Sequence, residues 1–212
     1  SRQDEKPVEY HLTMRDSPQR ASGVAANPAA DGIIAGIHFF ILADLLVFAA
    51  LFVGFMVERS EEVALFNQSA ELLNPWVGIL NTLILVTSGV CVVFAVNAAR
   101  AGRTKLVRRW ILAAFVVGLG FGISKVLEYG DKISQGITMH TNDFYMFYYA
   151  LTGAHFLHFL GGMVALALVW HLASKNPVYG PCFGTVESVG LYWHMVDLLW
   201  LFIFPLLYLL GT

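Results

Sequence analysis

Five apolar runs, each long enough to cross a membrane as a helix, constrain the fold of this chain more than any other sequence feature. They cover roughly residues 33–57, 77–99, 110–129, 144–173 and 189–210. A hydrocarbon core about 30 Å thick needs about 20 helical residues, and lipid cannot satisfy the backbone of an open strand. No run alternates with the period of a barrel strand. We therefore expect an all-α integral membrane bundle of five transmembrane helices.

The composition excludes a soluble or nucleic-acid-binding protein. Hydrophobic residues make up 57% of the chain and charged residues only 13%, whereas soluble domains have about 45–50% and about 25%. The net charge is -2, and no long basic stripe is interleaved with aromatic residues. The apolar excess is expected to face lipid or partner subunits.

The distribution of basic residues predicts how the bundle is oriented. Ten Lys and Arg residues fall on the side of the N-terminus and of the second and fourth connections, against two on the other side. The positive-inside rule then places the N-terminus in the cytoplasm and the C-terminus outside. Residues 1–32 lack the apolar core of a signal peptide. We interpret them as a polar cytoplasmic tail, followed by a five-helix domain over 33–212.

Several helix ends carry recognisable signals. Asn74 and Pro75 suit a capping residue followed by a first-turn proline, and Asn142-Asp143 is expected to cap the fourth membrane helix. Pro205 lies inside the fifth run and predicts a kink, because proline removes one backbone hydrogen bond.

Ionisable residues inside a membrane span are costly, so each is a candidate functional residue. Asp44 lies about 16 Å along the first helix, near the bilayer centre, with no local partner. His155 and His158 are three residues apart on one face of the fourth helix, near the same depth. We expect at least one of them to contact Asp44. The alternative is that each histidine bonds a backbone carbonyl or a hydroxyl of a neighbouring helix.

Two further pairs have the same i, i+3 spacing. Lys125 and Glu128 lie near the outer end of the third helix, where a self-neutralising pair with an outward-reaching lysine is the simplest interpretation. His194 and Asp197 lie near the inner end of the fifth helix. We expect these two to hydrogen-bond each other, with a proton-handling role as the alternative.

A metal or haem site within this chain is disfavoured. His155 and His158 could share a metal, but a redox site needs further ligands. The remaining histidines do not converge on the midplane pair, and there is no Cys-x-x-Cys-His motif.

Three stretches make the sequence resemble the cytochrome c oxidase subunit III family. They are Leu127-Glu128-Tyr129, residues 147–158 (FYYALTGAHFLH) and residues 192–200 (YWHMVDLLW). Their order, spacing and helix placement agree with that family, and the resemblance extends over nearly everything from Gly36 to Gly211.

The resemblance implies a subunit without haem or copper of its own. Such a subunit packs against the catalytic subunit, binds lipids, and supports the stability and proton uptake of that partner. Asp44 matches the intramembrane carboxylate of the family, which is usually a glutamate that reacts with carbodiimides; the aspartate is shorter, so that reactivity does not carry over. The other recurring polar positions of the family fall on Glu128, His155, His158, His194 and Asp197.

The number of helices distinguishes between types of subunit within this family. Seven-helix members have two additional N-terminal helices, which form one arm of a lipid-filled cleft. Five-helix versions occur in ubiquinol oxidases and as an accessory subunit of bacterial nitric oxide reductase. The chain is similar to the accessory subunit of nitric oxide reductase in four places, which are residues 81–85, 96–100, 136–144, and 195–200 ahead of 204–210.

We therefore expect a non-catalytic accessory subunit of a respiratory haem-copper complex, either a terminal oxidase or a nitric oxide reductase, in the inner membrane of a bacterium. Haem and metal are expected in the catalytic partner and bound phospholipid on this chain. The alternative function is an independent proton- or ion-translocating protein that uses Asp44, Glu128, His155 and His158 as a relay.

Overall fold

The computed structural model describes residues 28–175 and 181–210, and these ranges contain six helices and no strand. The helices are α1 (Pro28–Glu61), α2 (Val63–Glu71), α3 (Pro75–Arg100), α4 (Thr104–Ser134), α5 (Asp143–Lys175) and α6 (Pro181–Tyr208). All except the short α2 are long and apolar enough to cross a membrane. The all-α fold with five spanning helices is confirmed. Most of the predicted tail lies outside the described residues, but α1 already begins at Pro28.

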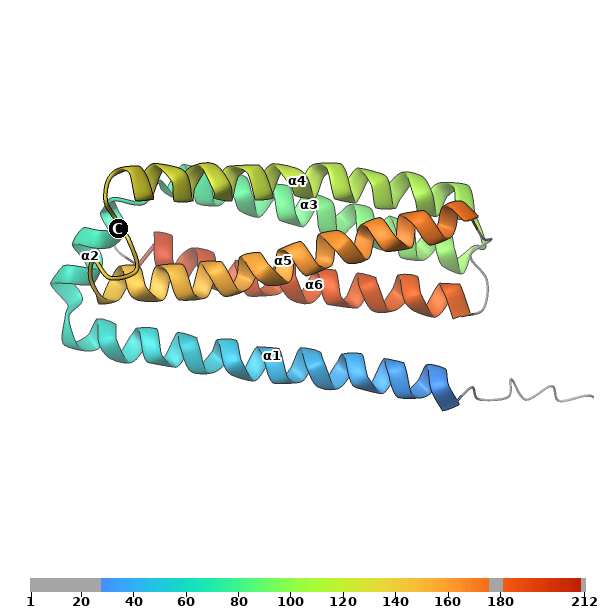
Figure 1. Ribbon diagram of the computed structural model, residues 1–212, viewed down its shortest axis with the longest axis horizontal. Coiled ribbons are helices and arrows are strands. Elements are labelled where there is room, and N and C mark those ends of the chain that lie inside the picture. The colour runs from blue at the N-terminus through green and yellow to red at the C-terminus, as the bar shows by residue number, and fades with distance from the viewer. Residues whose placement is uncertain (1–27, 176–180, 211–212) are drawn as a thin grey trace, which may run out of the picture.

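Four of the long helices form a closed ring and the fifth lies outside it. Within the described residues α3 packs on α4 and α6, and α5 packs on α4 and α6, which completes the ring. Helix α1 packs on α5, α6 and α2, and has no packing contact with α3 or α4. Figure 1 shows α1 running along the side of the α5–α6 layer, opposite α3 and α4. The four-helix ring is therefore the core, and α1 is an outer element.

The short helix α2 was not expected. It follows α1 after one non-helical residue, Glu62, and lies at the end of the bundle where α3 begins (Figure 1). Its buried side is anchored by Phe66, whose ring centroid lies 5.2 Å from Phe55 of α1 and 5.7 Å from Phe144 of α5. Nine residues are too few for a helix to be stable alone, so α2 depends on these tertiary contacts.

The ends of the helices follow the signals in the sequence. The Asn74 side chain accepts a hydrogen bond from Trp76 N at 3.0 Å, and Asn142 accepts one from Tyr145 N at 2.9 Å. Both predicted caps are confirmed. Helix α4 ends at Ser134, and Gly136 just beyond it has φ +76°, in the left-handed region that glycine tolerates best. Helix α6 continues through Pro205 to Tyr208.

Glycine allows close packing within the ring. A Cβ atom placed on Gly162 of α5 would lie 2.7 Å from the indole of Trp193 of α6, so the two helices approach closely at this point. Some other glycines have open space around them. A Cβ placed on Gly36 of α1 would meet nothing within 4 Å. Gly162 is thus under a steric constraint that Gly36 escapes.

Candidate functional site

The most elaborate polar site lies inside the ring, around Lys125 of α4. Its Nζ atom donates hydrogen bonds to Glu128 Oε2 at 2.9 Å and to the Tyr208 hydroxyl at 2.7 Å. The Glu128 Oε1 atom accepts further bonds from the hydroxyls of Tyr208 and, at 2.6 Å, Tyr148. Lys125, Glu128, Tyr148 and Tyr208 therefore form one connected network across α4, α5 and α6, which we call the lysine cluster.

Aromatic rings enclose the ammonium group of the lysine cluster. The Nζ atom lies 4.9 Å from the ring centroid of Trp200 and 5.3–5.9 Å from those of Tyr208, Tyr148 and Tyr129. Such faces attract a cation, more strongly where water is excluded. Lys125 is 0% exposed. The predicted ion pair with Glu128 is confirmed, but the outward-reaching lysine is wrong, because the hydroxyl and the π faces inside the ring replace the water that the lysine would otherwise seek.

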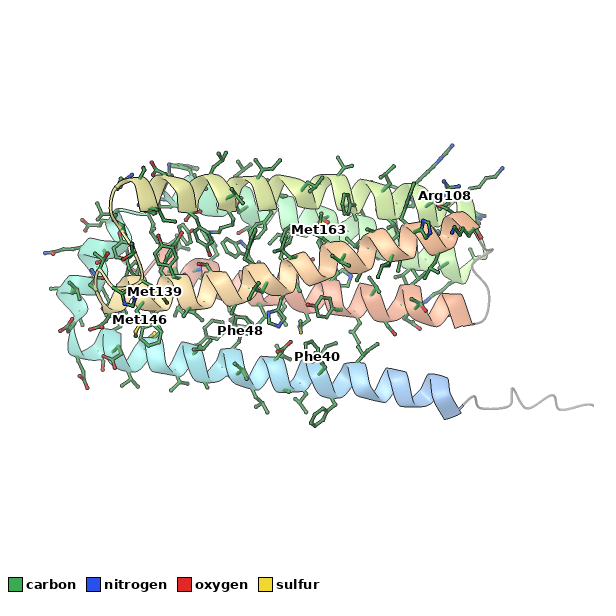
Figure 2. The ribbon with its side chains drawn as sticks, viewed as in Figure 1. Phe40, Phe48, Arg108, Met139, Met146 and Met163 are labelled. Atoms are coloured by element: carbon green, nitrogen blue, oxygen red, sulfur yellow. The ribbon has the colours of Figure 1, made fainter. Side chains whose placement is uncertain are left out.

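The second polar site joins α1 to the ring. Nε2 of His158 lies 2.9 Å from Oδ2 of Asp44, although the angle is poor for a hydrogen bond. The predicted contact between Asp44 and a histidine of the fourth membrane helix is thus confirmed for His158. Figure 2 labels Phe40 and Phe48 along the boundary between α1 and the α5–α6 layer, and both rings lie within 6.4 Å of the His158 ring.

The other ring nitrogen of His158 bonds within its own helix. Nδ1 of His158 is 2.7 Å from the carbonyl oxygen of Ala154. Because a carbonyl only accepts, Nδ1 carries the hydrogen of this bond. Nε2 is then the ring nitrogen that faces Asp44 of α1.

His155 bonds a backbone carbonyl of a neighbouring helix, which is the alternative given above for the two histidines. Its Nε2 atom lies 3.1 Å from the carbonyl oxygen of Val196 in α6, and the ring is fully buried against Phe121 and Trp200. Because a carbonyl only accepts, Nε2 of His155 is the donor. The two histidines of α5 therefore serve different neighbours. His158 faces α1, whereas His155 ties α5 to α6.

His194 and Asp197 of α6 lie together at ion-pair distance. Nδ1 of His194 is 3.7 Å from Oδ2 of Asp197, which is longer than a direct hydrogen bond. The carboxylate of Asp197 rests against Gly89 of α3, where an added Cβ atom would collide with Oδ2. The two side chains lie close together, but the hydrogen bond expected from the spacing is not formed at this distance. The carboxylate of Asp197 is instead part of the α3–α6 contact.

Sequence reasoning missed the partners of the lysine cluster that come from other helices. Trp200 and Tyr208 lie on one face of α6 at i and i+8, a spacing that could have indicated a shared environment. The Trp200 Nε1–H also donates to Thr82 Oγ1 of α3 at 3.0 Å. Nothing local in the sequence indicates that this face of α6 meets Lys125, because that depends on the register between α4 and α6.

Among the described residues no three His, Cys, Asp or Glu side chains are grouped as metal ligands would be. His155 and His158 turn their nitrogens to different helices, as described above. Within the described residues, the geometry gives no support to a metal ion shared by His155 and His158.

Five apolar spans with buried charge pairs define the class as a polytopic helical membrane protein. Sequence comparison then identifies the family. The sequence model of the family described as "Cytochrome c oxidase subunit III" matches residues 10–212. The chain belongs to the cytochrome c oxidase subunit III family.

Individual relatives agree with this assignment. Cytochrome c oxidase subunit 3 of Corynebacterium diphtheriae is 30% identical over 195 residues, which cover 91% of this chain and 93% of that protein. Cytochrome c oxidase subunit 3 of Prototheca wickerhamii is 35% identical over 205 residues, covering 89% and 73%. Cytochrome bo(3) ubiquinol oxidase subunit 3 of Pseudomonas putida is 25% identical over 179 residues, covering 84% and 86%. The chain is similar to subunits of oxidases with different electron donors.

Proposed function

We propose that this chain is a non-catalytic accessory subunit of a respiratory haem-copper complex and stabilises the catalytic subunit. Family membership supports the partner class. The observation that carries the structural role is that its polar side chains join helices to one another. Lys125 links α4 to α6, His155 links α5 to α6, and Trp200 links α6 to α3. Such contacts fix the register of the bundle, and a fixed register presents a constant lipid-facing surface for a partner to bind.

Orientation and location complete the proposal. The turn between α3 and α4 and the start of α1 lie at one end of the bundle, and α2 and the end of α6 lie at the other (Figure 1). The basic residues of the sequence concentrate at the first end, including the turn residues Arg100 and Arg103. We place that end in the cytoplasm of a bacterium and the α2 end outside the inner membrane.

Two electron acceptors fit this role. The names of the relatives favour an oxygen-reducing partner, whereas residues 81–85, 96–100 and 136–144 resemble the accessory subunit of nitric oxide reductase. Co-purification from the native membrane distinguishes them. The partner should bring haem absorption, and the complex should consume either oxygen or nitric oxide.

Deletion of the gene tests the proposal. We expect the amount or the turnover lifetime of one haem-copper complex to fall, and the wild-type chain supplied in trans to restore it. The measurements are a haem difference spectrum of membranes and the decay of activity during turnover. Unchanged amount and activity of every haem-copper complex would contradict the proposal.

Independent ion translocation is the competing function, and the packing around His155 argues against it. The rings of Phe121 and Trp200 lie 5.5 and 5.3 Å from the His155 ring, so large side chains surround the histidine that a relay would use. Reconstitution of the chain alone decides the matter. Proton flux that Asp44→Asn abolishes would favour translocation over the accessory role.

A further inference from the structure

Asn81 of α3 carries a buried amide group that takes no part in the contacts described above. The residue is 0% exposed, and neither its Oδ1 atom nor its Nδ2 atom has a hydrogen-bond partner among the described residues. Buried polar groups in folded proteins nearly always have a partner, which is either a protein group or an ordered water molecule. Asn81 therefore needs a partner that the side chains and backbone of the ring do not supply.

The register between α3 and α4 places Asn81 close to the lysine cluster. The Ser88 hydroxyl of α3 donates a hydrogen bond to the carbonyl oxygen of Ala114 of α4 at 2.8 Å. The two helices are antiparallel neighbours, so Asn81, seven residues before Ser88, lies level with Phe121, seven residues after Ala114. Seven residues make about two turns, so Asn81 and Ser88 share one face of α3. Asn81 thus faces α4 about one turn away from Lys125.

Two side chains of α6 indicate the same position for Asn81. A Cβ atom placed on Gly78, which lies one turn before Asn81, would be 3.3 Å from the ring of Tyr208. The Trp200 indole donates to Thr82, the residue that follows Asn81, at 3.0 Å. The ammonium group of the lysine cluster bonds the Tyr208 hydroxyl at 2.7 Å and lies 4.9 Å from the ring centroid of Trp200. The ammonium group and Asn81 are therefore neighbours of the same two α6 side chains.

The ammonium group of Lys125 also has an N–H that lacks an acceptor atom. An ammonium has three donors. Within the described part of the chain, Lys125 donates to Glu128 Oε2 and to the Tyr208 hydroxyl, which accounts for two of them. The surrounding aromatic rings attract the positive charge through their faces. A group that accepts from the third N–H and also donates to the amide of Asn81 would satisfy both residues. Water has both properties.

We propose that the ring binds one ordered water molecule between Lys125 of α4 and Asn81 of α3. The water accepts a hydrogen bond from the Lys125 ammonium and donates one to Oδ1 of Asn81. An anion does not suit this position, because Glu128 already neutralises the ammonium. Through this water the hydrogen bonds of the lysine cluster extend to α3 and join all four helices of the ring. The inference rests on the packing of the ring and does not depend on which enzyme the chain joins.

A high-resolution map of the chain, purified with any partner that stays bound, tests the water site directly. We expect one water molecule within hydrogen-bond distance of both Lys125 Nζ and the Asn81 amide. An Asn81 amide that bonds another protein group directly, or that contacts only apolar atoms, would overturn the inference.

Substitution of Asn81 gives an independent test, because the sign of its effect depends on whether the amide is bonded. Asn81→Leu keeps the approximate size of the side chain. If water joins the amide to Lys125, the thermal midpoint in detergent should fall by about 2–4 °C, since a buried hydrogen bond is lost. If the amide has no partner, its removal should raise the midpoint. Asn97→Leu, at an exposed position of the same helix, is the matched control and should change the midpoint little.

A double-mutant cycle shows whether the effect of Asn81 passes through the lysine. In the background Lys125→Met/Glu128→Gln the water has lost its cationic partner, so Asn81→Leu should lower the midpoint less than it does in the wild type. An equal fall in the two backgrounds, or a rise when Asn81→Leu is made in the wild type, would overturn the inference.

Discussion

Two of the ion pairs, Lys125–Glu128 and Asp44–His158, place charged side chains within the membrane-spanning bundle in different surroundings. Lys125 and Glu128 lie inside the four-helix ring, where two tyrosine hydroxyls complete their coordination. Asp44 and His158 lie where α1 meets the ring, and their side chains are 17% and 20% exposed. The inner pair is fixed by several bonds from three helices. The outer pair is held by one contact between two helices, so the two pairs should respond very differently to substitution.

The largest effect should come from breaking the inner pair. Glu128→Gln leaves the ammonium of Lys125 buried without a counter-charge, and removing one partner of a buried pair costs about 3–5 kcal/mol. We expect a large fall in thermal stability in detergent and poor accumulation in the membrane. Glu71→Gln, at an exposed position of α2, is the matched control. The double variant Lys125→Met/Glu128→Gln should recover part of the loss. A Glu128→Gln protein as stable as the control would remove the lysine cluster as a stabilising element.

The next largest effect should come from adding a methyl group to a closely packed glycine of the ring, compared with the same change at an open glycine of α1. Gly162→Ala forces a Cβ against Trp193, and overpacking of this kind costs about 1–3 kcal/mol. Gly36→Ala meets open space in α1 and should be neutral or slightly stabilising, since alanine favours helix by about 1 kcal/mol. Thermal unfolding of both variants gives the comparison. Equal midpoints would contradict the close approach of α5 and α6.

Substitution of the outer pair should have a smaller and more local effect. Asp44→Leu removes the contact with His158, whereas Asp44→Asn keeps a hydrogen-bonding group. Polar contacts between membrane helices contribute about 0.6–1.7 kcal/mol. We expect faster amide exchange in α1 for Asp44→Leu than for Asp44→Asn, with exchange in α3–α6 unchanged. Identical exchange and thermal stability in the two variants would eliminate the contact.

The smallest effect should come from a single neutral hydrogen bond inside the ring. Thr82→Val keeps the shape of the side chain but removes the acceptor of the Trp200 indole, at an expected cost of about 0.5–1.5 kcal/mol. Tryptophan fluorescence should also shift, because the indole loses its partner. Thr87→Val, at an exposed hydroxyl on the same helix, should change neither stability nor fluorescence. A Thr82→Val protein indistinguishable from that control would show that the bond contributes nothing measurable.

Local patterns predicted the helices and their pairs, because spacing along a helix is information the sequence holds directly. The caps at Asn74 and Asn142 and the Lys125–Glu128 pair were predicted in this way. The Asp44 contact was predicted from the similar depth of Asp44 and His158 in the membrane. The family roles of His194 and Asp197 remain predictions. What local patterns could not supply was the side toward which Lys125 turns, since that depends on which face of α6 packs against α4.

The same distinction explains why α2 was missed. Its nine residues carry no long periodic pattern, and its stability comes from Phe55 and Phe144, which belong to other helices. A cavity of about 320 Å³ beside the end of α4 was likewise invisible in the sequence, because its walls come from α4 and from the segment that leads into α3. Features that arise where separate segments meet require the three-dimensional arrangement.

The position of α1 has a consequence for biosynthesis. This helix is made before the rest of the bundle, yet within the described residues its only long-helix neighbours are the last two, α5 and α6. His158 is synthesised about 114 residues after Asp44, which takes on the order of 10 s at translation rates of about 5–20 residues per second. Throughout that interval the aspartate must cross or wait in the membrane without its histidine, which is costly for an ionisable group. The first helix is thus inserted with an unpartnered carboxyl group, and the contact that ties it to the ring can form only after α5 has been made.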